Sequence, residues 1–157
     1  MFLLCNRYKH LQYINKHFLS KELPVVSDYH IFKNTIFAAR TLKPIEWTKY
    51  KQIYDILTED MPKPNLVIFL NASLETLLHR INKRGRNVEK NIDHTYLLQL
   101  SEDYKHYISL FKKQNPTIPV ISLDGDKLDF VNNAEHLSSV LSLVEQTVKK
   151  ELDIHYV

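Results

Sequence analysis

Apolar and polar residues follow one another along the chain in a pattern that predicts helices separated by short apolar strands. In the first stretch, Leu4, Leu11 and Ile14 recur at the spacing that places side chains on one face of a helix. Ser73 and Asp93 stand where side chains cap the starts of two later helices. The predicted helices cover residues 2–21, 30–42, 45–60, 74–84 and 94–114, with a final one along the stripe from Leu137 to Val148.

Three apolar runs between these helices predict strands, at residues 24–28, 65–71 and 120–123. The run at 65–71 is nearly continuous, which is typical of parallel strands covered on both faces. Strands that alternate with helices predict an α/β fold with a parallel sheet. Three strands are few for such a sheet, so part of it is expected to be absent from this chain.

The length and composition predict one domain over residues 1–157, because 44% of the residues are apolar and 25% are charged. The small number of predicted strands makes it a partial domain. Cys5 is the single cysteine, so the chain forms no internal disulfide, which suits a reducing cytoplasm. No apolar run reaches the roughly 18 residues of a membrane span. The first residues also lack the basic start and the cleavage site of a signal peptide. We therefore expect a cytoplasmic protein that does not bind membranes.

Glycine is rare: the chain holds two, Gly85 and Gly125, 40 positions apart. A phosphate-binding loop of Walker type or a dinucleotide fingerprint needs two or three glycines within about eight residues, because the backbone must turn tightly against phosphate. Neither motif exists in these 157 residues.

A cluster of arginines is the strongest candidate for chemistry. Arg80 and Arg84 lie on one face of a predicted helix, Gly85 lets the chain leave that helix, and Arg86 follows with Glu89 close behind. Planar, permanently charged guanidiniums suit a transferring phosphoryl group, whose charge grows in the transition state. The same pattern is also typical of a solvated helix end, where cations oppose the helix dipole and glycine terminates the helix.

Two further residues are candidates by position. Asp28 ends a predicted strand, and the carboxyl ends of parallel strands host ligands, so its carboxylate could hold a hydrated Mg²⁺. Its alternative role is to begin the next helix as a cap. Arg7 lies on the first predicted helix, where by position alone it reads as a surface arginine.

The segment after the last predicted strand holds Asp124-Gly125-Asp126 and then Asp129 and Phe130. It could contact a nucleotide base, or it could be a plain turn into the final helix. The eight histidines form no metal-binding spacing, so no metal ligated directly by protein side chains is expected. A net charge of +3 without a basic, aromatic-rich stripe argues against nucleic-acid binding.

Several segments together resemble the deoxynucleoside kinase family, in its Gram-positive bacterial deoxyguanosine and deoxyadenosine kinase branch. The most specific is the arginine-rich segment Arg-Ile-Asn-Lys-Arg-Gly-Arg-Asn-Val-Glu. The resemblance is carried, in order along the chain, by residues 2–9, 25–32, 36–38, 64–70, 80–89, 96–100 and 119–124.

This resemblance implies a P-loop-kinase-like parallel sheet with flanking helices, and transfer of the γ-phosphoryl group of ATP to the 5′-hydroxyl of a deoxynucleoside with Mg²⁺. Residues of about 80–90 would form a lid. By the resemblance, Arg80, Arg84 and Arg86 would contact the phosphates, and Glu89 would hold the 3′-hydroxyl of the sugar.

The resemblance also implies roles outside the lid. Arg7 would read the base, and Asp28 would lie near Mg²⁺ as the acidic residue of the family's Glu/Asp-Arg-Ser motif. Asp129 and Phe130 would lie against the adenine of ATP. The family forms homodimers through helices, and the apolar stripe of the first helix would permit one here.

The chain departs from the family in two respects. Tyr29 and His30 follow Asp28, where the family has arginine and serine. The family's glycine-rich loop, its first two strands and the glutamate that acts as general base are expected upstream of the segment that matches Met1. We therefore expect an incomplete sheet with its first two strands missing, marginal stability with unpaired strand edges, and an inactive fragment.

Two other functions stay open at this point. The chain could be a non-catalytic remnant that binds a partner without turnover. It could also be a nucleoside monophosphate kinase of thymidylate-kinase type, which would form a diphosphate instead of a monophosphate. Guanine and adenine are not distinguished.

Overall fold

The computed structural model describes residues 1–86 and 92–155, and the chain divides into two compact units, Met1–Lys63 and Pro64–Val157. Side chains are described as far as residue 150, apart from those of 87–91. Glu89 and part of the predicted lid therefore lie outside the described residues. The prediction of one partial domain over 1–157 stays a prediction.

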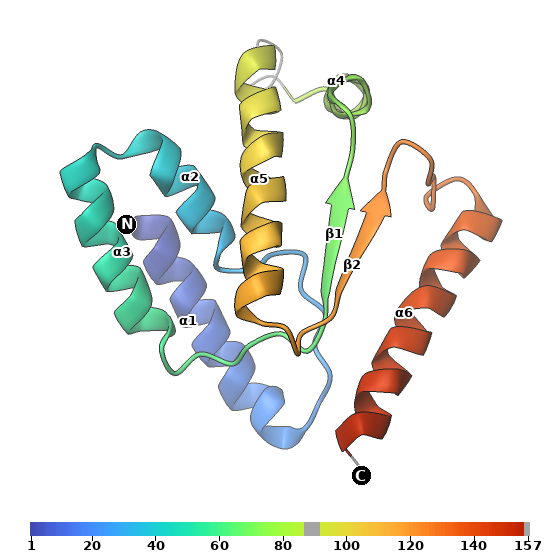
Figure 1. Cartoon of the computed structure of the whole chain (residues 1–157), viewed down its shortest axis with the longest axis horizontal. Helices are drawn as coiled ribbons and strands as arrows, with labels where there is room; N and C mark the ends of the chain where they lie inside the picture. The colour runs from blue at the N-terminus through green and yellow to red at the C-terminus, as the bar shows by residue number, and fades with distance from the viewer. Residues whose placement is uncertain (87–91, 156–157) are drawn as a thin grey trace. The chain divides into compact units, whose positions relative to one another are not determined.

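The first unit is helical (Figure 1). Its elements are α1 (Phe2–His17), a single 3₁₀ turn η1 (Leu19–Lys21), α2 (Lys33–Thr41) and α3 (Pro44–Thr58). Its core joins Leu4 of α1, Ile31, Ala38 of α2 and Tyr50 of α3, and Leu4 is only 1% exposed. The apolar face predicted for the first helix thus supplies the centre of this unit.

The local sequence explains where α3 begins. Pro44 is its first residue, a position where the absent N–H of proline costs nothing. The backbone N–H of Lys43 donates to the Glu46 carboxylate at 2.9 Å, which satisfies a group that the helix leaves unpaired. The predicted start at 45 is therefore correct within one residue.

The strand predicted at residues 24–28 does not form, and this prediction is wrong. These residues have no regular secondary structure, and Val26 is fully exposed. A strand exists only by pairing with a neighbour. Within the described part of the chain the two observed strands pair with each other, and this segment pairs with neither. The apolar character of the segment alone could not supply a partner.

The second unit carries the sheet. Its elements are β1 (Val67–Asn71), α4 (Leu74–Arg84), α5 (His94–Gln114), β2 (Val120–Asp124) and α6 (Ala134–His155). The two strands are parallel, and their register runs from Val67 opposite Val120 to Asn71 opposite Asp124. The α/β class with a parallel sheet and flanking helices is thereby confirmed, with two described strands where three were predicted.

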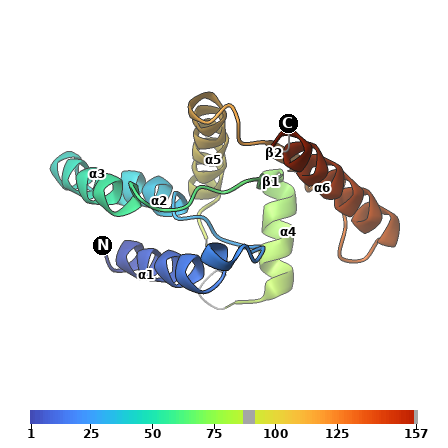
Figure 2. The same ribbon diagram turned by 90° about the horizontal axis from the view of Figure 1, so that it is seen from below.

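The helices of this unit take different directions relative to the strands. In Figure 1, α5 runs alongside β1, whereas α4 is seen end-on beyond the strand tips. Figure 2, turned by 90°, shows α5 end-on and α4 along its length. The arrangement places the start of α4 next to the carboxyl ends of both strands, because Asn71 and Asp124 end the strands at the same level.

Side-chain caps set the limits of α4 and α5 as predicted. The Ser73 hydroxyl accepts a hydrogen bond from the Thr76 N–H at 3.2 Å, and the Asp93 carboxylate accepts one from the Thr95 N–H at 2.7 Å. Gly85 ends α4 with φ at +66°, a left-handed conformation that glycine adopts without steric cost.

The sheet is covered unevenly. Ile121 and Leu123 of β2 are buried, whereas Ile68 and Leu70 of β1 are 43% and 54% exposed. The expectation that strand 65–71 is covered on both faces is therefore wrong, because these two apolar side chains of β1 are exposed. No helix among residues 1–86 and 92–155 combines the length and apolar character needed to cross a membrane.

Candidate functional site

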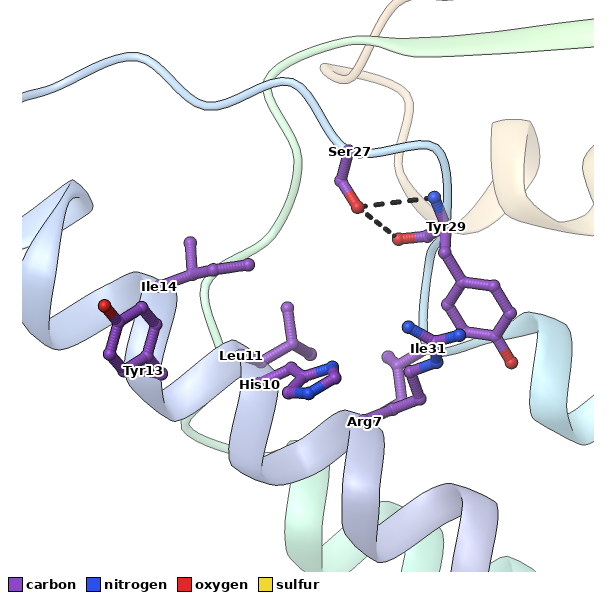
Figure 3. A pocket seen from close by; sticks show the side chains of 8 residues that line it. All are labelled: Arg7, His10, Leu11, Tyr13, Ile14, Ser27, Tyr29 and Ile31. Atoms are coloured by element: carbon purple, nitrogen blue, oxygen red, sulfur yellow. Dashed lines mark hydrogen bonds between the residues drawn. The ribbon is translucent and has the colours of Figure 1, made fainter.

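A pocket of about 190 Å³ opens in the first unit, between α1 and the segment that leads into α2 (Figure 3). Arg7 supplies its one guanidinium. Apolar side chains of α1 form much of the remaining wall. The pocket is lined by Arg7, His10, Leu11, Tyr13, Ile14, Ser27, Tyr29 and Ile31.

Arg7 stacks on an aromatic ring within this pocket. Its Cζ atom lies 3.8 Å from the centroid of the Tyr29 ring, a cation–π arrangement, and the two side chains face each other in Figure 3. Burial raises the pKa of Tyr29, while the positive charge of Arg7 opposes that shift. Arg7 therefore stacks on the neutral form of Tyr29.

The hydroxyl of Tyr29 donates to Oδ1 of Asn34, which is 7% exposed. Two buried polar atoms, Nδ2 of Asn34 and the hydroxyl of Tyr50, have no hydrogen-bond partner within the described residues. Burial, with a smaller contribution from Tyr29, raises the pKa of Tyr50 to about 12. Arg7 is thus linked through Tyr29 to a buried polar group on α2.

A short turn fixes the segment that carries Tyr29. The Ser27 hydroxyl donates to the carbonyl oxygen of Tyr29 at 2.7 Å and accepts the N–H of Tyr29 at 3.3 Å. Asp28 lies inside this turn and is exposed. It is not the capping residue of α2, since the residue before that helix is Phe32.

The exposed carboxylate of Asp28 suits a hydrated ion better than an ion ligated by several side chains. Among the residues with described placement, no three His, Cys, Asp or Glu side chains come together as a metal site. Mg²⁺ keeps several waters and takes one or two carboxylates, so a single exposed carboxylate such as Asp28 fits it. The role of Asp28 near Mg²⁺ stays a prediction.

The arginines of the predicted lid differ in their surroundings. Arg80, in the middle of α4, donates from Nη2 to the carbonyl oxygen of Gly125 at 2.7 Å. Arg84 lies in the last turn of α4 and Arg86 follows Gly85, and both side chains are exposed. The structure therefore brings Arg80 to the turn after β2, and it places Arg84 and Arg86 at the helix end.

The turn after β2 is held by several hydrogen bonds. The Asp126 carboxylate accepts the backbone N–H of Ser73 at 2.9 and 3.1 Å, and this bond, ahead of weaker contributions from Thr76 and Arg80, lowers the pKa of Asp126. Farther on, the Asp129 carboxylate accepts hydrogen bonds from Asn132 and from the N–H of Val131. Both carboxylates therefore stabilise backbone, a role that their sequence positions alone did not reveal.

The predicted site residues thus fall into two groups. Arg7 and Asp28 belong to the first unit. The second unit holds Arg80, Arg84, Arg86, Asp129 and Phe130. Sequence reasoning missed Tyr29 as the partner of Arg7; an aromatic residue where the family has arginine was the available signal.

Known proteins resemble the chain over most of its length. The family model described as "Deoxynucleoside kinase" matches residues 1–149. A protein of Bacillus subtilis (strain 168) named deoxyguanosine kinase is 49% identical over 94% of this chain and 72% of its own length. One of Lactobacillus acidophilus named deoxyadenosine kinase is 31% identical over 80% of the chain and 63% of its own length. Human deoxycytidine kinase is 32% identical, and the chain spans 47% of it.

Proposed function

Because the chain belongs to the deoxynucleoside kinase family, whose members are phosphotransferases, we propose that it serves ATP-dependent phosphorylation of a purine deoxynucleoside at the 5′-hydroxyl. The names of the Bacillus and Lactobacillus relatives, for deoxyguanosine and deoxyadenosine, support a purine. ATP is the phosphoryl donor that this family implies.

The stacking of Arg7 on Tyr29 carries the proposal at the nucleoside end. A guanidinium donates hydrogen bonds within its own plane, so stacking on a ring face leaves its edge directed at a ligand. Purines offer N7 as an acceptor, and guanine adds O6 beside it. Arg7 would therefore bind the base in the pocket of Figure 3, and Tyr29 would hold the Arg7 guanidinium in position.

At the phosphate end, Arg84 and Arg86 would stabilise the charge that develops on the transferring group, because planar cationic donors match phosphate oxygens. Arg80 was predicted to act with them. Asp129 and Phe130 would lie against adenine, and Glu89, outside the described residues, would accept the 3′-hydroxyl of the sugar. Asp28 would hold Mg²⁺ through water; such an ion neutralises charge on the β- and γ-phosphates.

In the proposed reaction, the 5′-oxygen forms a bond to the γ-phosphorus while the bond to the β–γ bridging oxygen breaks. ADP leaves, and the hydroxyl proton passes to a general base. We assign that role to none of the described residues. These 157 residues also contain no glycine-rich loop to hold the triphosphate. We therefore propose that the chain alone binds nucleoside with negligible turnover.

The experiment compares binding of deoxyguanosine and deoxyadenosine to the purified chain by calorimetry, for the unsubstituted protein, Arg7→Gln and Lys9→Gln. Lys9 is an exposed cation on the same helix, so its substitution removes the same charge without touching Tyr29. We expect Arg7→Gln to weaken binding on the order of tenfold, the effect of losing hydrogen bonds from a charged donor. Equal affinities for all three forms would contradict the proposal.

Product analysis separates the remaining alternatives. Incubation with ATP, Mg²⁺ and a deoxynucleoside or its monophosphate is expected to give no more than traces of monophosphate. Formation of a diphosphate would identify a monophosphate kinase of thymidylate-kinase type. Absence of any nucleoside or ATP binding would favour the non-catalytic remnant.

Homodimer formation and cytoplasmic location belong to the same proposal. Phe2 and Leu3 at the start of α1 are 80% and 64% exposed, which supports a helix-mediated contact between copies. Light scattering of the purified chain is expected to report a dimer whose mass falls when both residues are replaced by serine.

A further inference from the structure

Arg80 is tied to a turn that lies 45 residues away in the sequence. Its Nη2 atom donates to the carbonyl oxygen of Gly125 at 2.7 Å, although the arginine itself stands on the exposed side of α4. Gly125 is buried and directly follows β2. An exposed helix is therefore joined to the backbone at the carboxyl end of the sheet.

Gly125 can take this place because it has no side chain. Its N–H donates to the carbonyl oxygen of Asn71 at 2.6 Å. A Cβ atom on Gly125 would lie 2.9 Å from that oxygen and 3.2 Å from Nη1 of Arg80. Either the backbone or the arginine would have to move, so the contact depends on glycine at this position.

A second bond joins the same turn to the start of α4. The Asp126 carboxylate accepts the N–H of Ser73, the capping residue of that helix. Ser73 and Arg80 are seven residues apart, about two helical turns. Gly125 and Asp126 therefore hold α4 at two separate points, which fixes the direction of the helix as well as its start.

Further hydrogen bonds order the residues on either side of Asp129. The N–H of Leu128 donates to the carbonyl oxygen of Asp124 at 3.0 Å, and the N–H of Asp129 donates to Nδ1 of His136 at 3.0 Å. The Asp129 carboxylate then accepts the N–H groups of Val131 and Asn132. Hydrogen bonds thus order residues 124–128 and, separately, residues 129–136. Leu128 and Asp129 are adjacent in the chain, so fixing Gly125 limits where Asp129 and Phe130 can lie.

We propose that Arg80 is a positioning residue: through the Gly125 carbonyl it holds the segment 124–132 against α4, and so sets the adenine-contacting segment relative to the helix that carries Arg84. This proposal rests on the proposed function for the adenine role of Asp129 and Phe130. Its structural core, the link from Arg80 to Gly125, does not depend on nucleotide.

The test is a double-mutant cycle of Arg80→Gln and Gly125→Ala in the whole chain, with Lys127→Gln as a control that removes a cation from the same turn. Two quantities are measured: NMR hydrogen exchange of the backbone amides of residues 126–132 without ligand, and the affinity for ATP with Mg²⁺. If Arg80→Gln does not fold, Arg80→Lys replaces it, because lysine keeps the charge but not the planar fork.

We expect each single substitution to accelerate exchange of these amides on the order of tenfold, as loss of a hydrogen bond from a charged donor would. The double variant should be no faster than the singles, and Lys127→Gln should match the unsubstituted chain. ATP affinity should fall by similar factors in both single variants.

The proposal is overturned if Gly125→Ala leaves exchange and ATP affinity unchanged, or if the two substitutions act additively on exchange. A loss of ATP affinity in Arg80→Gln alone would instead identify Arg80 as a direct phosphate ligand. If no form binds ATP, the nucleotide role proposed for this chain fails, while the exchange data still decide the link between Arg80 and Gly125.

Discussion

The guanidinium of Arg7 lies over the ring of Tyr29, 3.8 Å from its centroid, and the hydroxyl of that tyrosine donates to the buried side chain of Asn34. A charged residue on α1 is thereby positioned by a group on α2 that it does not touch. The position of Arg7 in the pocket should therefore depend on the hydrogen bond between Tyr29 and Asn34, and this dependence can be measured.

Replacing Tyr29 by phenylalanine is expected to lower the free energy of unfolding by about 1–2 kcal/mol. The ring under Arg7 is kept, but Oδ1 of Asn34 loses its donor, and a buried polar group without a partner is costly. Urea unfolding measures this change. Tyr13→Phe is the matched control, because Tyr13 lines the same pocket and is 57% exposed; an equal loss in both variants would contradict the argument.

Stability is expected to fall in mild acid because of His30. Burial lowers the pKa of this side chain from the ordinary 6.5 to about 4. Between pH 6.5 and about 4, His30 is therefore protonated in the unfolded chain but neutral in the folded chain. The contribution of neutral His30 to the free energy of unfolding is fully present above pH 6.5. About 2–3 kcal/mol of this free energy is lost as the pH falls from 6.5 towards 4.

Denaturant unfolding across this pH range, for the unsubstituted chain and for His30→Asn, measures the effect. Asparagine keeps an acceptor near Nδ1, to which the N–H of Phe32 donates at 3.3 Å. The acid loss should shrink in His30→Asn and persist in His10→Asn, where an exposed histidine is removed. A loss that persists in His30→Asn would show that another group is responsible.

Gly85 is expected to tolerate asparagine better than alanine. Its φ of +66° lies in the left-handed region, which costs an ordinary residue about 1 kcal/mol. An added Cβ would lie 4.0 Å from the carbonyl oxygen of Asn82, so the penalty comes from the backbone and not from crowding. Alanine should lower the unfolding free energy by about 1 kcal/mol and asparagine by less. Thermal unfolding of Gly85→Ala and Gly85→Asn measures the two changes in unfolding free energy. Equal losses of stability in both variants would contradict this prediction.

The Asp126 carboxylate is expected to stabilise α4 except in strong acid. Its bond from the Ser73 N–H lowers its pKa below the ordinary 3.8. A depressed carboxyl pKa gives stability that is present above 3.8 and is lost as the pH falls through the folded value. Asp126→Asn should therefore lower the melting temperature at neutral pH. Below pH 3.8 the melting temperatures of this variant and the unsubstituted chain should come closer together. Asp60→Asn, at an exposed carboxylate of the first unit, should leave the neutral-pH value unchanged.

Local chemistry made much of the second unit predictable. Ser73, Asp93 and Gly85 act within a few residues of themselves, through a cap bond or a backbone angle, so their roles follow from the neighbouring sequence. The strand at 120–124 was likewise recognisable from its apolar run. The strand predicted at 24–28 failed because apolar composition does not provide the neighbour that a strand requires.

By itself, the sequence determined the α/β class, the limits of the capped helices and the arginines that mark the family, since each depends on residue type and short-range spacing. Tertiary structure alone decided that Arg7 stacks on Tyr29 and that Arg80 reaches Gly125. These pairs are separated by 22 and 45 positions. Their contact depends on how whole elements pack, because a side chain's partner across such a separation is set by the backbone path between them.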